Sequence, residues 1–173
     1  MNAKATLLVV EDDHDLQEVL FEQLQLLPIN IVLAENGASA LKIVNGGERT
    51  IDAILSDINM PEMNGLELLK NLREMDNFVP FVFLTGYGDK AKVIEALKLG
   101  AFDFLEKPYQ QSELFSVIKK SCELGQQLSS LEEESGKDSL FQNLDPIQLA
   151  KVRDIKRQLL VMKKTMLITK RRA

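Results

Sequence analysis

The sequence predicts an α/β fold in which a parallel sheet carries helices on both faces. Short apolar runs alternate with longer segments whose apolar residues recur every three or four positions, and this unit occurs five times between residues 6 and 124. Runs of the first kind are typical of strands buried on both faces, and segments of the second kind are typical of amphipathic helices. Strands that alternate with helices favour a doubly wound parallel sheet with right-handed crossovers. Ligands of such sheets bind beyond the carboxyl ends of the strands.

The first unit consists of a strand over residues 6–10, an acidic run at 11–13, and a helix from about His14. We expect Pro28 to end this helix, because proline lacks the backbone N–H that a helix interior requires. The helical spacing rests on five apolar residues: Leu16, Val19, Leu20, Leu24 and Leu27.

The second and third units follow the same order. Residues 29–34 predict a strand, Asn36 is a good cap for the next helix, and the glycines at 46–47 end that helix. Residues 51–56 predict the third strand, and a helix begins at residues 64–65.

The last two units complete the repeat. Residues 80–84 predict a strand, and a helix runs from about residue 89 to 99, where Gly100 suits the left-handed conformation of a helix end. Residues 101–105 predict the fifth strand, and the fifth helix begins near Ser112. Three residues of the fourth helix are predicted to be buried: Val93, Ala96 and Leu97.

Length and composition suit one domain of ordinary size with a modest appendage. The chain has 173 residues, of which 45% are hydrophobic and 27% are charged. Cys122 is the single cysteine, which excludes an internal disulfide. The sequence contains neither an apolar stretch of membrane-spanning length nor a signal peptide, so we expect a cytoplasmic protein.

Charge is distributed unevenly along the chain. Residues 1–150 hold 12 basic and 25 acidic side chains, a net charge of −13, whereas residues 151–173 hold 9 and 1, a net charge of +8. The asymmetry indicates an acidic body that favours cations and a basic tail that favours anionic partners or the body itself.

The carboxyl ends of the predicted strands carry acids, a hydroxyl and a lysine. Clustered carboxylates repel one another and raise their own pKa values unless a cation is present, and oxygen ligands suit Mg²⁺. A carboxylate beside Mg²⁺ and a fixed cation can attack phosphorus. Asp57 is then the candidate nucleophile. The supporting residues are Glu11 and Asp12 as metal ligands, Lys107 as the charge partner of the phosphoryl oxygens, and Thr85 as a hydrogen-bond donor to them.

These strand ends resemble the receiver domains of two-component response regulators. The resemblance covers about residues 4–125, and four separate motifs carry it: Val9-Val10-Glu11-Asp12, Asp57 with Met60-Pro61 and Gly65, Leu84-Thr85-Gly86, and Lys107-Pro108. It implies a flavodoxin-like sheet with strand order 2-1-3-4-5. It also implies that Asp57 accepts a phosphoryl group from a histidine kinase or phosphotransfer protein.

The resemblance assigns further roles. Asp12 is expected to ligate Mg²⁺ directly, and Asn59 is expected to contribute its backbone carbonyl while its side chain influences phosphoryl hydrolysis. The hydroxyl of Thr85 would move toward the phosphoryl group, and the ring of Phe104 would rotate inward as the switch aromatic. The output surface would comprise the fourth helix, the fifth strand and the fifth helix, and the peptide bond at 107–108 would be cis.

The remainder of the chain divides into two predicted segments. Beyond the receiver domain at 4–125, residues 126–144 form either a linker or an extension of the fifth helix. Leucine spacing favours the extension, whereas Gly125 is a natural helix terminator. Residues 145–173 predict a basic amphipathic helix that begins with an acidic cap and a proline.

Three functions follow, in order of preference. The first is a phosphorylation-controlled regulator that contacts a downstream protein through the output surface and the C-terminal helix, with a homodimer as an alternative use of that helix. The second is a DNA-binding regulator that uses the basic helix. The third, a Mg²⁺-dependent phosphatase, needs a general acid two residues after Asp57, where Asn59 stands, so we expect no turnover of external substrates. His14 is predicted to be exposed and Cys122 to be buried, each without a chemical role.

Overall fold

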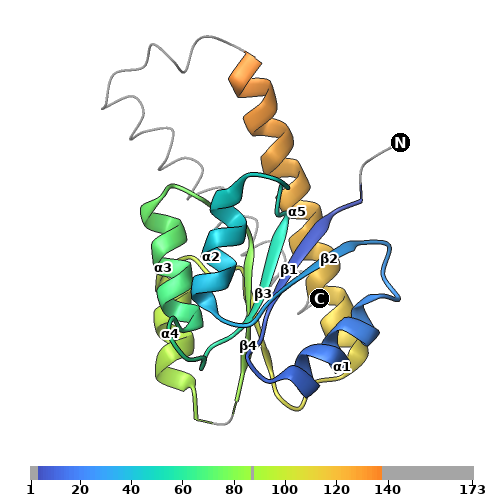
Figure 1. Ribbon diagram of the computed structural model, residues 1–173, viewed down its shortest axis with the longest axis vertical. Helices are drawn as coiled ribbons and strands as arrows, with labels where there is room; N and C mark the ends of the chain where they lie inside the picture. Colours follow the sequence, from blue (N-terminus) through green and yellow to red (C-terminus); the bar gives the residue numbers. More distant parts are fainter. Residues whose placement is uncertain (1–3, 87, 138–173) are drawn as a thin grey trace, which may run out of the picture. The chain divides into compact units, whose positions relative to one another are not determined.

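The computed structural model describes residues 4–86 and 88–137, and these form a five-stranded parallel sheet in the order β2-β1-β3-β4-β5. The predicted doubly wound fold and strand order are confirmed. Figure 1 shows α2, α3 and α4 on one face of the sheet and α1 and α5 on the other. The elements are β1 (Thr6–Val10), α1 (His14–Leu24), β2 (Asn30–Ala34), α2 (Gly37–Gly46), β3 (Ala53–Asp57), α3 (Gly65–Glu74), β4 (Phe81–Thr85), α4 (Lys90–Lys98), β5 (Asp103–Glu106) and α5 (Gln111–Lys137).

Strand register brings the carboxyl ends of the strands together at one end of the sheet. In the ladder of β3 and β4, Asp57 lies opposite Leu84, and in that of β4 and β5, Thr85 lies opposite Glu106. The interior strands β1 and β4 are buried along their whole length, whereas the outermost strands, β2 and β5, are partly exposed. The loops that follow neighbouring strands therefore meet beyond the carboxyl ends of the middle strands.

Polar caps fix where three of the helices begin. The side chain of Asp13 caps α1, and Asn36 caps α2 by accepting from a backbone N–H of the first turn. Asn64 and Glu67 form a capping box at the start of α3, in which each side chain bonds to the backbone of the other residue. Because such caps satisfy N–H groups that lack helical partners, they hold the strand-end loops in one conformation.

The core on the α2, α3 and α4 face is built around β4. Phe81 and Phe83 are fully buried there, with ring centroids 4.7 Å apart. Leu97 in α4 was predicted to be buried but is 39% exposed, and Val19, one of the residues that carry the helical spacing of α1, is 46% exposed. The stripe of each helix that faces the sheet is narrower than the apolar spacing indicates.

Some element boundaries differ from the predicted ones. Helix α1 ends at Leu24, before Pro28, and the intervening residues form turns. Strand β3 continues to Asp57, and β5 begins at Asp103. The N–H of the buried Phe102 donates to the carbonyl of Phe81 just before that ladder starts.

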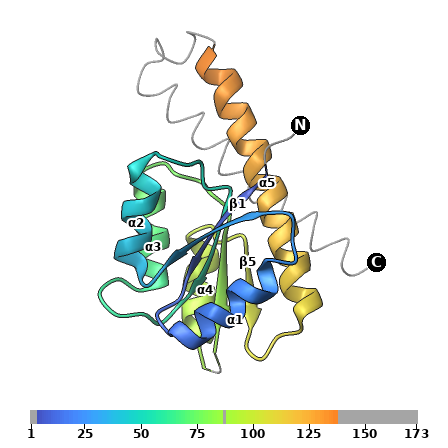
Figure 2. The same cartoon turned by 45° about the vertical axis from the view of Figure 1, so that its right-hand side comes forward.

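Helix α5 continues through Gly125 to Lys137. A Cβ atom at residue 125 would lie 1.7 Å from the carbonyl oxygen of Asp52, so the glycine allows the helix to pack directly on the backbone that leads into β3. Figure 2 shows the first part of α5 on the same side of the sheet as α1. The basic helix predicted at 145–173 lies outside the described residues. Among the described helices, none combines the length and the apolar character that crossing a bilayer requires.

Candidate functional site

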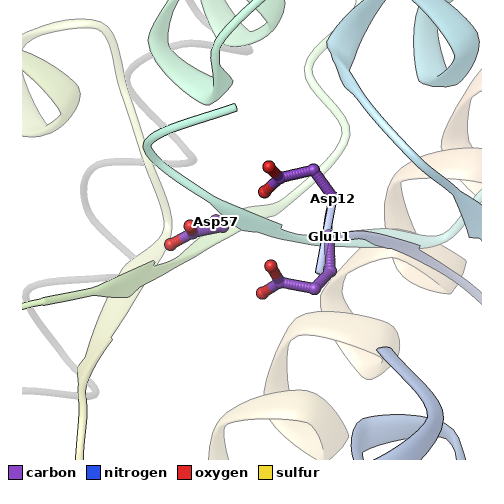
Figure 3. Close-up of side chains that lie close together, drawn as sticks. All are labelled: Glu11, Asp12 and Asp57. Carbon is purple, nitrogen blue, oxygen red and sulfur yellow. The ribbon is translucent and has the colours of Figure 1, made fainter. Parts of the chain in front are cut away.

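Three carboxylates converge at the carboxyl ends of β1 and β3. Glu11 and Asp12 directly follow β1, Asp57 ends β3, and β1 and β3 are neighbours in the sheet. One carboxylate oxygen from each residue lies within 4.8 Å of those of the other two. Figure 3 shows the side chains of Glu11 and Asp12 extending toward the side on which Asp57 lies. Glu11 is buried, Asp57 is half-buried and Asp12 is exposed, so the cluster opens to solvent on the side of Asp12.

Close packing fixes the backbone at Asp57. The N–H of Gly65, the first residue of α3, donates to the carbonyl of Ile58 at 3.0 Å. A Cβ atom at residue 65 would lie 2.3 Å from the carbonyl oxygen of Asp57. The start of α3 therefore rests directly on the strand end that carries the carboxylate, which only glycine permits.

Lys107 enters the cluster from the loop after β5. Its Nζ lies 3.4 Å from Asp57 Oδ1 and 3.5 Å from Glu11 Oε2, and 27% of its side chain is exposed. The peptide bond to Pro108 is cis, as expected. The cluster holds three carboxylates and one ammonium, so when fully ionised it keeps an excess of two negative charges, which matches a divalent cation.

Burial perturbs the acids of this cluster. Desolvation raises the pKa of Asp57, and the charge of Lys107 and the N–H of Ile58 offset part of that rise. The pKa of Glu11 is also raised, first by burial and further by the charge of Asp57, against the lowering effect of Lys107. Ionised carboxylates held this close are unfavourable without a further positive charge, and all their ligand atoms are oxygens. The residues therefore fit Mg²⁺.

Thr85 and Phe104 line the same cavity. Thr85, at the end of β4, is buried, and its Oγ1 donates to the carbonyl of Leu105 at 3.5 Å. Phe104 in β5 is 42% exposed. Both line a cavity of about 780 Å³ between β4, β5 and the start of α4. A buried hydroxyl and an outward-facing ring thus share one open space.

The side chain of Asn59 turns toward α4. Lys92 Nζ donates a hydrogen bond to Asn59 Oδ1, and Asn59 Nδ2 donates to Asp89 Oδ1 at 3.4 Å. Asp89 and Lys92 form an ion pair at 3.8 Å. Sequence reasoning did not single out Asp89 or Lys92. Their spacing of three residues on a helix indicates a pair with each other, but only the folded chain brings them to Asn59.

His14 and Cys122 show no sign of a chemical role. His14 is exposed at the first position of α1, and the possible metal ligands found among the described residues do not include it. Cys122 is buried, and burial raises its thiol pKa to about 12, so the thiolate is absent at neutral pH. The predicted exposure of His14 and burial of Cys122 are confirmed.

Comparison with known proteins identifies the same region. The family model "Response regulator receiver domain" matches residues 7–119. Similar proteins include the transcriptional regulatory protein FixJ of Bradyrhizobium diazoefficiens, 31% identical over 121 residues that cover 70% of this chain and 58% of FixJ. Another is the regulatory protein AtoC of Escherichia coli, 32% identical over 72% of this chain and 26% of AtoC. The chain thus spans little more than half the length of FixJ and about a quarter of AtoC.

Solved structures agree with the sequence comparison. A response regulator receiver domain protein from Clostridium thermocellum superposes with a TM-score of 0.67 at 26% identity, covering 72% of this chain and 98% of that one. The N-terminal part of FixJ gives a TM-score of 0.64 at 28% identity, covering 70% and 95% of the two chains.

Proposed function

Because this chain belongs to the response regulator receiver domain family of two-component systems, we propose that Asp57 accepts a phosphoryl group from a histidine kinase or phosphotransfer protein. One observation carries the proposal: the half-buried carboxylate of Asp57 lies 3.4 Å from the ammonium of Lys107 and shares its space with Glu11 and Asp12. This arrangement combines the proposed nucleophile with a fixed cation and with oxygen ligands for a metal.

The chemistry follows from these positions. A carboxylate oxygen of Asp57 forms a bond to phosphorus while the bond from phosphorus to the donor's imidazole nitrogen breaks, and the electron pair stays on that nitrogen. Lys107 balances the charge of the phosphoryl oxygens, and the Thr85 hydroxyl donates a hydrogen bond to one of them. Such a site acts mainly by positioning and by charge neutralisation, so it needs no further reactive group.

Mg²⁺ is the metal that this site is proposed to bind. Glu11, Asp12 and Asp57 would hold it through carboxylate oxygens, and Asn59 through its backbone carbonyl. When bound, the ion supplies positive charge beside the phosphoryl oxygens. The all-oxygen ligand set and the excess negative charge of the cluster support this choice over zinc, which prefers nitrogen and sulfur ligands.

Phosphorylation would be transmitted by Thr85 and Phe104. If the hydroxyl of Thr85 turns from the Leu105 carbonyl to a phosphoryl oxygen, the exposed ring of Phe104 can rotate into the adjoining cavity. Phenylalanine has no hydroxyl, so the change is one of packing alone. Ile94 and Leu97 are also exposed on the neighbouring helix α4, and this apolar exposure supports the surface of α4, β5 and α5 as the proposed contact for a downstream protein.

DNA-binding regulation is the second candidate. FixJ is named a transcriptional regulatory protein, and residues 151–173 of this chain carry a net charge of +8. Gel shifts of the full chain, phosphorylated and unphosphorylated, at several salt concentrations test this candidate, because binding through basic side chains weakens steeply with salt. No shift at any salt concentration would exclude it. Turnover of external phosphate esters is not expected, because Asn59 provides no general acid.

The central proposal is tested by incubating the full chain with Mg²⁺ and acetyl phosphate and measuring its intact mass. The wild type should gain one phosphoryl group, and the Asp57→Asn variant should gain none. Asp15→Asn is a matched control, because Asp15 is an exposed carboxylate in the first turn of α1 and should leave the gain unchanged. A wild type that stays unmodified would contradict the proposal.

A further inference from the structure

The amide of Asn59 is held through both of its polar atoms. Its Oδ1 accepts from Lys92, its Nδ2 donates to Asp89 at 3.4 Å, and Asp89 and Lys92 pair at 3.8 Å. We call these three side chains the Asn59 ring. It joins the loop after β3, two residues beyond Asp57, to the beginning of α4.

Asp89 anchors this ring. Only 11% of its side chain is exposed, and its second oxygen accepts from the N–H of Gly86 at 2.9 Å, directly after Thr85. An aspartate at the start of a helix usually caps that helix, but Asp89 makes no capping hydrogen bond to α4. Its carboxylate is used instead to connect the end of β4 with Asn59, which distinguishes the ring from an ordinary solvated pair.

The ring fixes the orientation of the amide, because it uses one lone pair of the amide oxygen and one of the two N–H donors of the amide nitrogen. A free amide two residues from Asp57 can donate to, or accept from, a water molecule near a phosphoryl group on that carboxylate. In the Asn59 ring, Lys92 holds the carbonyl oxygen of the amide and Asp89 contacts its nitrogen, and both belong to a different element from Asp57. These two contacts turn the amide toward α4 and away from the position of a water molecule beside Asp57.

We propose that Lys92 and Asp89 are positioning residues that keep the Asn59 amide from assisting hydrolysis of the Asp57 phosphoryl group, and so lengthen its lifetime. In that hydrolysis a water oxygen bonds to phosphorus, the bond from phosphorus to the Asp57 oxygen breaks with its electron pair returning to the carboxylate, and the released phosphate keeps both protons of the water as dihydrogen phosphate. The inference rests on the proposed function, because it requires a phosphoryl group at Asp57.

A competing explanation is that Lys92 acts directly, through its charge, on the phosphoryl group. The two explanations differ in their dependence on the amide. If Lys92 works through Asn59, removing the amide makes Lys92 irrelevant to the lifetime. If Lys92 works through its charge, its removal has the same effect whether or not the amide is present. A double-mutant cycle between Lys92 and Asn59 separates them.

The first experiment examines the ring in the unphosphorylated full chain. The side-chain amide signals of Asn59 are identified in an NMR spectrum of ¹⁵N-labelled protein by their loss in Asn59→Ala. Lys92→Met, which keeps the aliphatic stem, should shift them. Lys98→Met, which removes an exposed ammonium from the last turn of the same helix, should not. Unshifted Asn59 signals in Lys92→Met would overturn the ring and with it the inference.

The second experiment measures the phosphoryl lifetime by intact mass after the phosphodonor is removed. Lys92→Met should lose the group about fivefold faster than the wild type, the effect of freeing one partly exposed hydrogen bond to a charged group. Lys92→Arg should restore the lifetime and Lys98→Met should match the wild type. In an Asn59→Ala background, Lys92→Met should have no effect.

The outcomes separate the inference from the proposed function. A wild type that never gains a phosphoryl group contradicts the proposed function, and the lifetime role of the ring is lost with it. A wild type that is phosphorylated, with a Lys92→Met lifetime no shorter than its own, overturns the inference alone. An acceleration that persists in the Asn59→Ala background also overturns it, in favour of a direct effect of charge.

Discussion

Replacing Gly125 by alanine should destabilise the protein, although local helix propensity indicates the opposite. Residue 125 lies inside α5, and an alanine Cβ would stand 1.7 Å from the carbonyl oxygen of Asp52, 2.5 Å from its carbonyl carbon and 2.8 Å from its Cα. All three are backbone atoms, so no side chain can turn aside. The helix and the segment that enters β3 must separate, which disturbs the packing of both.

The expected size follows from two opposing effects. Forcing extra volume into a packed site costs about 1 to 3 kcal/mol, and the upper end applies here because backbone must move. Alanine in place of glycine inside a helix returns about 1 kcal/mol. We therefore expect the free energy of unfolding to fall by about 2 kcal/mol, the difference between these two effects.

Urea unfolding of the full chain, followed by circular dichroism, measures this change. Gly46→Ala is the matched control, because Gly46 is also helical but has no atom within 4 Å of the position a Cβ would take. This control should be as stable as the wild type or more stable. A Gly125→Ala variant that behaves like Gly46→Ala would refute the close approach of α5 to Asp52.

Two further predictions concern charge. Burial raises the pKa of Asp57 above its ordinary value of 3.8, so the metal-free folded protein binds a proton at this carboxyl more tightly than the unfolded chain does. The contribution of Asp57 to the free energy of unfolding should therefore fall as pH rises from about 4 through the raised pKa. Urea unfolding across that range should show a weaker fall for Asp57→Asn, and an equal or steeper fall would contradict the reasoning. Arg73 is buried and donates to the carbonyls of Asn77, Val79 and Gly100. Arg73→Ala should therefore lower the free energy of unfolding by about 3 kcal/mol. Lys70→Ala, which removes an exposed ion pair at 4.0 Å, should change it by less than about 0.5 kcal/mol. Equal losses in the two variants would refute the role given to Arg73.

The convergence of the site could be predicted because it depends on topology. Parallel strands place all their carboxyl ends at the same end of the sheet, so the alternation of strands and helices predicted that Asp57, Glu11 and Lys107 would lie there together. Strand order came from the family resemblance. The roles of these residues in phosphorylation stay predictions, which the mass measurement tests.

Features that depend on contacts between distant segments could not be predicted. Gly125 has the local properties of a helix terminator, but its contact with Asp52 gives it a different role inside α5. The apolar spacing of α4 predicted that Leu97 is buried, but Leu97 is exposed. Spacing shows which residues share a face of the helix, and it does not show how much of that face the sheet covers. The hydrogen bond between Asn59 and Lys92 likewise could not be predicted, because neither the residues around Asn59 nor those around Lys92 indicate it.

The two edge strands also bear on self-association. Edge strands present unpaired N–H and C=O groups to other chains, and sheets are protected when these strands are short or flanked by proline. Strand β2 has five residues and follows Pro28, and β5 has four residues and is followed within two positions by Pro108. Each edge therefore offers only a short ladder for an added strand. If this receiver domain pairs with a second copy, its sheet is a poor template for strand addition, and the helical faces are the better surface for that contact.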